Sequence, residues 1–282
     1  MGTIEKAMQK LQLAQTTSAE NGDGALVKNP TVGGVQSRRT PIELDFARFK
    51  AMNLLVPEVV HDPLLEEYRR IKRPILRNAF GQEHERISGA RRNVVMVTSS
   101  IAGEGKTYTS INLALSMTLE LDRTVLLVDA DVIKPSITSY LGIDANQGLV
   151  DYLLGDSQDI ANYFLKTSIP NLSILPAGRK ERRTAELLAS GRMSSLVDEL
   201  AARYSDRIII FDAPPLLQTS EAGVLANLAG QVVVVVEANR TEKSTLKDAL
   251  AMLDKSRNVS MVLNKAERAR SVGYYGNYGV DS

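Results

Sequence analysis

The sequence contains no cysteine and no tryptophan, and it has no long hydrophobic run. Without cysteine the chain can form neither a disulfide framework nor a thiolate metal site, which is compatible with a reducing cytoplasm. The longest apolar stretch, residues 232–236, is far shorter than the roughly 20 residues that cross a bilayer. The sequence therefore predicts no membrane-spanning helix, and we expect any membrane association to be peripheral or to depend on a partner.

The sequence also has no large excess of positive or negative charge. The 34 Lys and Arg residues are balanced by 33 Asp and Glu residues, so bulk electrostatics gives no reason to expect a nucleic-acid partner. At 282 residues the chain has room for one α/β domain of about 200 residues together with additional arms.

A glycine-rich stretch at residues 100–107, Ser-Ile-Ala-Gly-Glu-Gly-Lys-Thr, predicts a phosphate-binding loop. It lies between an apolar run at 94–97 and a helical pattern, which is the strand, loop and helix context that such a loop needs. Lys106 would reach the β and γ phosphates, and Thr107 offers a hydroxyl to Mg²⁺. The usual pattern has glycine where Ser100 stands, but an ordinary glycine-rich turn would leave Lys106 unexplained. The predicted nucleotide contacts are Ala102, Gly103, Glu104, Gly105, Lys106, Thr107 and Tyr108.

Three aspartates follow two apolar, strand-like runs. Asp129 and Asp131 come after residues 124–128, and Asp212 comes after residues 207–211. Ligands of open parallel sheets bind outside the carboxyl ends of the strands, so these carboxylates belong near the loop. They could instead be helix caps, although two prolines soon after Asp212 argue against an immediate helix there. Phosphoryl transfer needs one carboxylate to hold Mg²⁺ through water and another to accept a proton. The predicted catalytic residues are Lys106, Asp129, Asp131 and Asp212, and the predicted metal-site residues are Thr107, Asp129 and Asp212.

Helical and strand patterns alternate beyond the loop. This order predicts an α/β fold of the P-loop NTPase type, with a mostly parallel central sheet and helices on both faces. We expect an amphipathic helix at 1–15, a linker and strap at 16–60, the main domain at 61–265, and a flexible C-terminal tail at 266–282.

A helix is predicted over residues 63–80, with Asp62 and Pro63 as its cap and first turn. Pro74 could kink this helix. Its charged face is either solvated, with internal ion pairs, or a contact between subunits. The residues assigned to that face are Glu66, Glu67, Arg69, Arg70, Lys72, Arg73 and Arg77.

The tail carries Tyr274, Tyr275 and Tyr278 among glycines. On its own this composition could be incidental. Combined with a phosphate-binding loop, it supplies phenols that a neighbouring kinase site could reach.

Residues 60–282 resemble the bacterial tyrosine autokinases, which are cytoplasmic P-loop kinases of polysaccharide assembly. The resemblance implies ATP and Mg²⁺ as cofactors and phosphorylation of Tyr274, Tyr275 and Tyr278 in trans. Glu66, Arg69 and Lys72 resemble the Glu-x-x-Arg-x-x-Arg motif that joins subunits of these kinases into a ring, with lysine where the last arginine is usual. A lysine lacks the bidentate fork of arginine, so weaker ring contacts are expected.

Further matches refine the resemblance. Asn264 resembles the adenine-contacting residue of related ATPases, and Ile133 replaces an arginine that is frequent after the second motif. The segments at 4–7 and 42–45 resemble the exosortase-associated branch of these kinases. That branch implies a separate membrane co-polymerase whose cytoplasmic segment activates the kinase, and a cognate tyrosine phosphatase is expected. The implied location is the cytoplasm, at the inner face of the membrane through this partner.

Two other functions remain open on sequence grounds. A ParA/MinD-type ATPase shares the fold and the nucleotide motifs, but its dimers depend on a lysine at the position of Ile101. An ATP-binding scaffold that signals through its oligomeric state, with little kinase activity, is compatible with every motif.

Overall fold

The computed structural model describes residues 40–57, 59, 62–82, 89–203, 206–254 and 258–267. The helix predicted at 1–15, most of the linker, and Tyr274, Tyr275 and Tyr278 lie outside the described residues.

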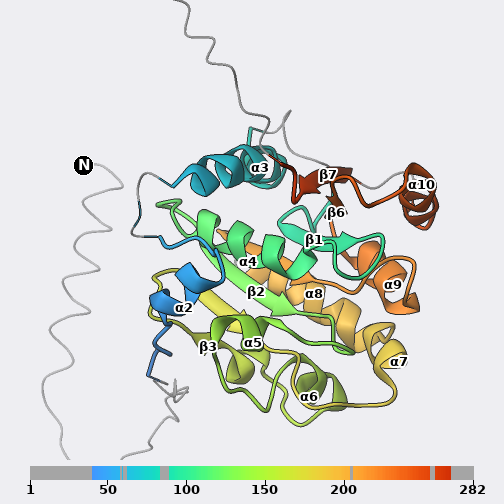
Figure 1. Ribbon diagram of the computed structural model, residues 1–282. Coiled ribbons are helices and arrows are strands. Elements are labelled where there is room, and N and C mark those ends of the chain that lie inside the picture. The colour runs from blue at the N-terminus through green and yellow to red at the C-terminus, as the bar shows by residue number, and fades with distance from the viewer. Residues whose placement is uncertain are drawn as a thin grey trace, which may run out of the picture. The chain divides into compact units, whose positions relative to one another are not determined.

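A seven-stranded sheet forms the centre of the fold, with the order β3-β4-β2-β5-β1-β6-β7 (Figure 1). All neighbouring strands are parallel except β3, which pairs antiparallel with β4. The inner strands are runs of Val, Ile and Leu that are buried on both faces, as expected for a parallel sheet covered by helices. The strands are β1 (Val94–Ser99), β2 (Thr124–Asp129), β3 (Leu165–Lys166), β4 (Leu172–Leu175), β5 (Arg207–Asp212), β6 (Gln231–Glu237) and β7 (Asn258–Asn264).

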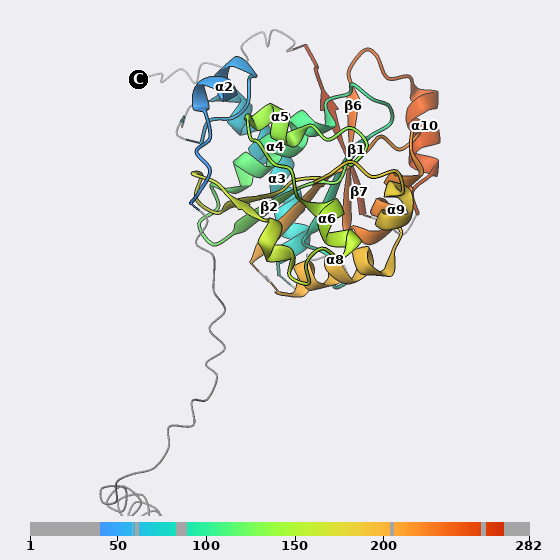
Figure 2. The same cartoon turned by 90° about the horizontal axis from the view of Figure 1, so that it is seen from below.

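Helices cover both faces of this sheet and enclose two hydrophobic clusters (Figures 1 and 2). The first face carries α2 (Phe46–Ala51), α3 (Pro63–Phe80), α4 (Lys106–Met117) and α5 (Ile137–Leu141). The second face carries α6 (Leu149–Leu154), η1 (Ile160–Tyr163), α7 (Thr184–Leu188), α8 (Gly191–Arg203), α9 (Ser220–Leu228) and α10 (Lys243–Ala251). The predicted fold class, an α/β sheet with helices on both faces, is confirmed.

Residues 42–56 pack against the hydrophobic cluster on the first face of the sheet, the face that carries α3 and α4. The N–H of Ile42 donates to the carbonyl of Lys166 at 2.8 Å, which extends the sheet edge by one isolated bridge. Phe49 of α2 is fully buried, and the N–H of Leu55 donates to Asn112 Oδ1 of α4 at 2.7 Å. The segment that leads into α3 is thereby held against the helix that follows the phosphate-binding loop.

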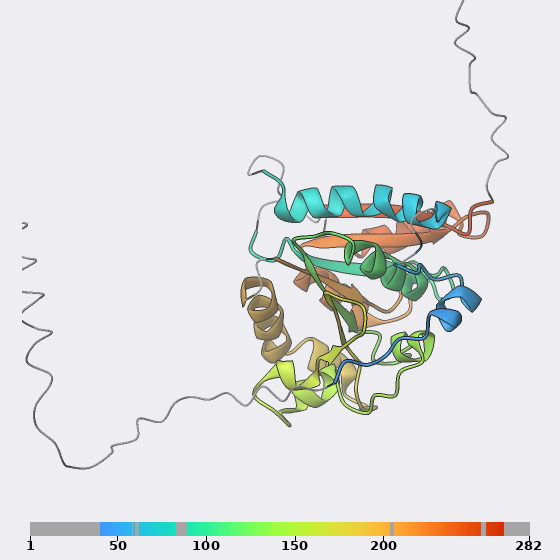
Figure 3. The ribbon, with the colours of Figure 1, turned by 90° about the vertical axis from the view of Figure 1, so that its left-hand side faces the viewer.

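Helix α3 begins at its predicted position, where Asp62 accepts a hydrogen bond from the N–H of Leu64, and it runs through Pro74. It lies along the sheet beside α4 (Figure 3). Its outer face carries Glu66 and Arg69, which form an ion pair with each other in solvent.

The predicted placement of Lys72 on that outer face is wrong. Lys72 is only 5 % exposed; its Nζ donates to the carbonyl of Ser116 at 2.6 Å and pairs with Glu120 at 2.6 Å. The buried residues of α3 recur at intervals of three and four, and Lys72 occupies one of these inward positions between Tyr68 and Ile75. Its ammonium binds the carboxyl end of α4, where helix carbonyls lack partners.

Candidate nucleotide and phosphoryl-transfer site

The phosphate-binding loop connects β1 to α4 at the carboxyl edge of the sheet. Gly103 and Gly105 adopt φ values of +92° and +97°, a region that residues with a Cβ rarely occupy. A Cβ on Gly105 would lie 2.1 Å from Asn264 Nδ2, so the loop has no room for a side chain there. Helix α4 starts at Lys106, directly after this turn, and its free N–H groups and positive dipole end favour anionic oxygens.

Glu104 shapes the loop from within. Its side chain is fully buried and accepts hydrogen bonds from the N–H of Ile101 at 2.8 Å and from the hydroxyl of Thr241. Glu104 is predicted as a nucleotide contact from its position in the motif, and this stays a prediction. Its carboxylate ties the loop to the segment after β6, and its carbonyl accepts from Asn264 Nδ2 at 2.8 Å.

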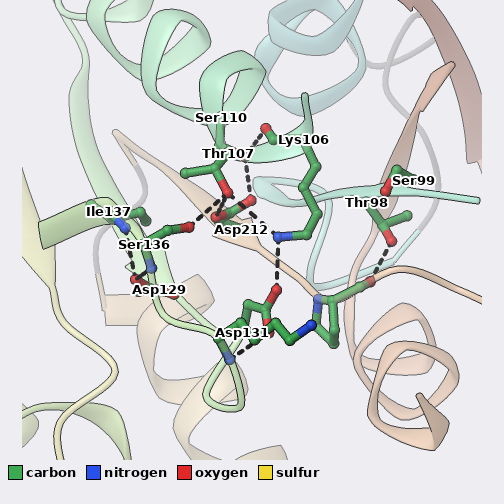
Figure 4. A network of polar contacts seen from close by, with 12 residues as sticks. Thr98, Ser99, Lys106, Thr107, Ser110, Asp129, Asp131, Ser136, Ile137 and Asp212 are labelled. Atoms are coloured by element: carbon green, nitrogen blue, oxygen red, sulfur yellow. Dashed lines mark hydrogen bonds and ion pairs between the residues drawn. The ribbon is translucent and has the colours of Figure 1, made fainter. Parts of the chain in front are cut away.

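Lys106 points into the site and pairs with Asp131, with 2.7 Å between Nζ and Oδ2 (Figure 4). Burial opposes charge on the ammonium, but the carboxylates of Asp212, Asp131 and Asp129 outweigh that effect and raise the pKa of Lys106. Lys106 therefore stays charged at neutral pH, as an electrostatic partner of phosphate oxygens must.

Thr107 and Asp212 form the centre of the polar network. The Thr107 hydroxyl donates to Asp212 Oδ2 at 2.6 Å and lies 3.1 Å from the hydroxyl of Ser136 (Figure 4). Ser110 donates to the other oxygen of Asp212 at 3.1 Å. Burial raises the pKa of Asp212, and Lys106 counteracts that shift. Ser110 and Ser136 were not predicted as site residues. Ser110 follows Lys106 by four residues, one helical turn, and this spacing could have indicated from the sequence that both lie on the same side of the helix.

Asp129 ends β2 and is fully buried. Its Oδ2 accepts from the N–H groups of Ser136 and Ile137, both at 3.0 Å, and so anchors the turn that precedes α5. Its Oδ1 has no hydrogen-bond partner among the described residues. Burial and then the nearby Asp212 carboxylate raise the pKa of Asp129 to about 8.

A cavity of about 540 Å³ opens beside these groups. Lys106, Thr107 and Asp131 contribute to its wall, whereas Asp129 and Asp212 lie behind it. Among the predicted carboxylates, Asp131 is therefore the one that faces incoming molecules. The other lining residues are Ala102, Gly103, Gly105, Tyr108, Ile133, Lys134, Ser136, Tyr140, Pro214, Pro215, Gln218 and Thr219.

The residues present fit a nucleotide phosphate chain and a magnesium ion. The start of α4, directly after the glycine turn, offers N–H groups to phosphate oxygens, and Asp129 Oδ1, which has no hydrogen-bond partner among the described residues, can contact a metal-bound water. No cluster of three or more His, Cys, Asp or Glu side chains within the described residues could hold a metal alone. A magnesium ion would thus use the Thr107 hydroxyl together with phosphate oxygens and water, which is its usual preference.

The residues that flank the loop on its other side belong to the carboxyl end of β7. Lys265 Nζ donates to the carbonyl of Gly103 at 2.8 Å, close to the contact that Asn264 makes with Glu104. Tyr108, predicted as a nucleotide contact, borders the cavity, but its hydroxyl donates to the carbonyl of Asn53 at 2.7 Å.

Comparisons with known proteins agree with this geometry. A family model described as an AAA domain matches residues 92–265. The tyrosine-protein kinase YwqD of Bacillus subtilis (strain 168) is 35% identical over 187 residues, which cover 64% of this chain and 77% of that protein. The solved VpsO kinase domain is 30% identical with a TM-score of 0.58, covering 73% of this chain and 100% of that chain. The septum site-determining protein MinD of Pyrococcus horikoshii OT3, solved with Mg-ADP, is 27% identical with a TM-score of 0.51 and covers 63% of this chain and 72% of that chain.

The family model covers most of the chain, and the kinase relatives cover the site together with the sheet that supports it. The site, the sheet order and these similarities lead to one conclusion: the chain belongs to the family of bacterial tyrosine-protein kinases with a P-loop AAA domain.

Proposed function

We propose that this protein transfers the γ-phosphoryl group of ATP to tyrosine, with its own Tyr274, Tyr275 and Tyr278 as acceptors in trans. The observation that carries the proposal is the contact between Lys106 and Asp131 at the wall of the cavity, beside the Thr107–Asp212 pair. Bound ATP would supply the transferable phosphoryl group, and Mg²⁺ would offset part of the phosphate charge.

The chain's own residues then have separate roles. Lys106 exchanges its contact with Asp131 for phosphate oxygens, which leaves the Asp131 carboxylate free at the cavity wall. A phenol that enters the cavity donates its proton to Asp131 as its oxygen forms a bond to the γ phosphorus. The bond between that phosphorus and the bridging oxygen of ADP breaks at the same centre, so the electron pair leaves with ADP.

Asp212 and Asp129 act from behind the cavity in this proposal. Asp212 orients the Thr107 hydroxyl toward the metal position through the 2.6 Å hydrogen bond. Asp129 fixes the turn at residues 136 and 137 and offers its free oxygen to a metal-bound water. Asn264 is proposed to contact the adenine ring from its position beside the loop.

Assembly and partners are proposed from the family membership. Glu66 and Arg69 lie on the exposed face of α3, where a neighbouring subunit could replace their mutual ion pair, whereas the burial of Lys72 removes it from that contact. We propose a homo-oligomeric ring, activation by the cytoplasmic segment of a membrane polysaccharide co-polymerase, and reversal by a tyrosine phosphatase. No helix among the described residues has the length and apolarity to cross a membrane. Each phosphate on the tail would add about −1.5 to −2 charges, so phosphorylation should loosen the ring by repulsion.

Intact mass spectrometry after incubation with Mg-ATP tests the proposal. The mass of the wild type should increase by that of one or more phosphoryl groups. The masses of Lys106→Met and of the variant with Tyr274, Tyr275 and Tyr278 changed to Phe should not increase. The triple variant serves as the matched control, because it leaves the cavity intact and should still bind ATP in calorimetry. If the wild type binds ATP and its mass stays unchanged, the result favours an ATP-binding scaffold with little kinase activity over a tyrosine kinase.

A further inference from the structure

In the part of the chain that the structure describes, the outer strand β7 has an apolar face that is exposed. Val259, Met261 and Leu263 alternate along it with exposures of 36%, 60% and 63%. The intervening residues of β7 point toward α3 and are half-buried, and Val262 packs against the cluster under that helix. The exposed set therefore lies on the opposite side of the sheet from α3.

The register between β6 and β7 explains why this face is open. Val232, Val234 and Val236 of β6 pair directly with the three exposed residues of β7 and share their face. These β6 residues belong to the cluster beneath α9 and α10, where Val232 and Val234 are fully buried. The helical cover thus stops one strand before the sheet ends.

The free edge of β7 also has none of the usual protection. Its sequence, Asn-Val-Ser-Met-Val-Leu-Asn, contains no charged residue, no proline and no glycine. Among the described residues β7 pairs with β6 alone, so one row of its backbone N–H and C=O groups lacks a strand partner. Exposed edge strands of this kind normally carry lysine, proline or a bulge, because they pair readily with another extended segment.

The chain makes a turn directly after β7. Lys265 has a φ of +55°, a left-handed conformation that is typical of tight turns, and contacts from Asn264 and Lys265 hold this turn against the loop at residues 103–104. Residues 268–282 follow, and an extended segment of seven of them would match the length of β7.

The sequence of this following segment has the period of a half-buried strand. Its even-numbered positions carry Val272, Tyr274, Tyr278 and Val280, with glycine at 276, while Tyr275 is the one large apolar side chain at an odd position from 271 to 281. Alternation of this kind is typical of a strand with one apolar face. In an antiparallel pair, opposite residues share a face, so the even positions can meet the exposed residues of β7.

We propose that residues 271–280 pair antiparallel with the free edge of β7 in their own chain and place Tyr274 and Tyr278 against the apolar face formed by Val259, Met261 and Leu263. The pairing itself is independent of catalysis, but its effect on phosphorylation rests on the proposed function. The returning segment runs from the carboxyl edge of the sheet, where Lys106 lies, toward the amino edge. The paired form therefore holds its tyrosines away from the cavity, and it must dissociate before a neighbouring active site can phosphorylate them.

Disulfide formation tests the pairing without ATP, and the absence of native cysteine makes every introduced pair specific. The full chain with Met261→Cys receives a second cysteine at each position from 271 to 280 in turn. Directly opposite residues lie about 4.5–5.5 Å apart at Cα, within the range of a disulfide. The yield of intrachain disulfide should be highest at one even position, fall off at the even positions on either side of it, and be low at odd positions. Leu121→Cys, at a site that is 95% exposed on the chain segment after α4, is the matched control and should give no alternation.

Amide hydrogen exchange provides the second measurement. Exchange of residues 271–280 should be slower in the wild type by roughly tenfold than in a double variant with Met261→Lys and Leu263→Lys, whereas Leu121→Lys should keep the wild-type rate. A yield without alternation, disulfides that link two chains, or equal exchange in all three proteins would overturn the proposal; linked chains would assign the face to a second copy. None of these results depends on kinase activity, so they are separable from a failure of the proposed function.

Discussion

Replacing Asp129 with asparagine should remove a pH dependence of stability that the nucleotide-free protein shows near neutral pH. The native pKa of Asp129 is raised to about 8 from its ordinary value of 3.8, chiefly by burial. Between these two values the folded protein retains a proton that the unfolded chain has lost. The folded state thus binds more protons, and the free energy of unfolding falls as pH rises, with a limiting slope of about 1.4 kcal/mol per pH unit.

The size of the effect follows from these two pKa values. From pH 6 to pH 8 the unfolded chain is fully ionised at this position, while the folded protein is half ionised at the upper limit. The free energy of unfolding should therefore drop by roughly 2 kcal/mol over this interval. Because Asp129 and Asp212 lie close together, the proton belongs to the pair, and Asp129→Asn removes the repulsion that holds it there.

Urea unfolding at pH 6 and pH 8, with no nucleotide or divalent metal, measures the drop. The free energy of unfolding should fall by about 2 kcal/mol in the wild type and by much less in Asp129→Asn. Comparing the two proteins removes the contribution of other groups that titrate in this interval, because both proteins share them. Asp198→Asn is the control, because Arg91 lowers the pKa of Asp198, which therefore does not titrate between pH 6 and pH 8. Equal pH dependence in the wild type and Asp129→Asn would refute the reasoning.

Two further substitutions test the framework of the site. Gly105→Ala should abolish nucleotide binding in calorimetry while the protein stays folded by circular dichroism, because the new Cβ would lie 2.1 Å from Asn264 Nδ2 at a φ of +97°; tight binding by the variant would contradict the loop geometry. Lys72→Met should lower the free energy of unfolding by about 2 kcal/mol in urea, since it leaves a buried helix carbonyl without its charged donor. The exposed neighbour Arg73→Met should change it by less than about 0.5 kcal/mol, and an equal loss in both would argue against the buried role of Lys72.

The elements that place the site could be predicted from the sequence because their signals are local. Helix α3 begins and ends at its predicted residues, since the Asp62 cap, Pro63 and an apolar stripe define it without reference to the rest of the fold. The strands that end at Asp129 and Asp212 were also found, because buried parallel strands are continuous runs of branched apolar residues.

The contacts that could not be predicted depend on packing between distant segments. The three-and-four spacing already pointed Lys72 inward, but only the position of α4 supplies the carbonyl that stabilises its charge. The short strand β3 and helix α5 were not found, because too few residues form them for a period to be visible. The link from Glu104 to Thr241 joins residues 137 positions apart, which a loop motif cannot reveal.

The buried carboxylate of Glu104 has a thermodynamic consequence for ligand capture. One side chain joins the turn at residue 101 to the hydroxyl of Thr241, so contacts within the chain itself hold the phosphate cradle in shape. A rigid receptor loses little conformational entropy when it is filled. Weakening this internal brace at Thr241, which is not among the predicted nucleotide contacts, would slow association and shorten the lifetime of the complex.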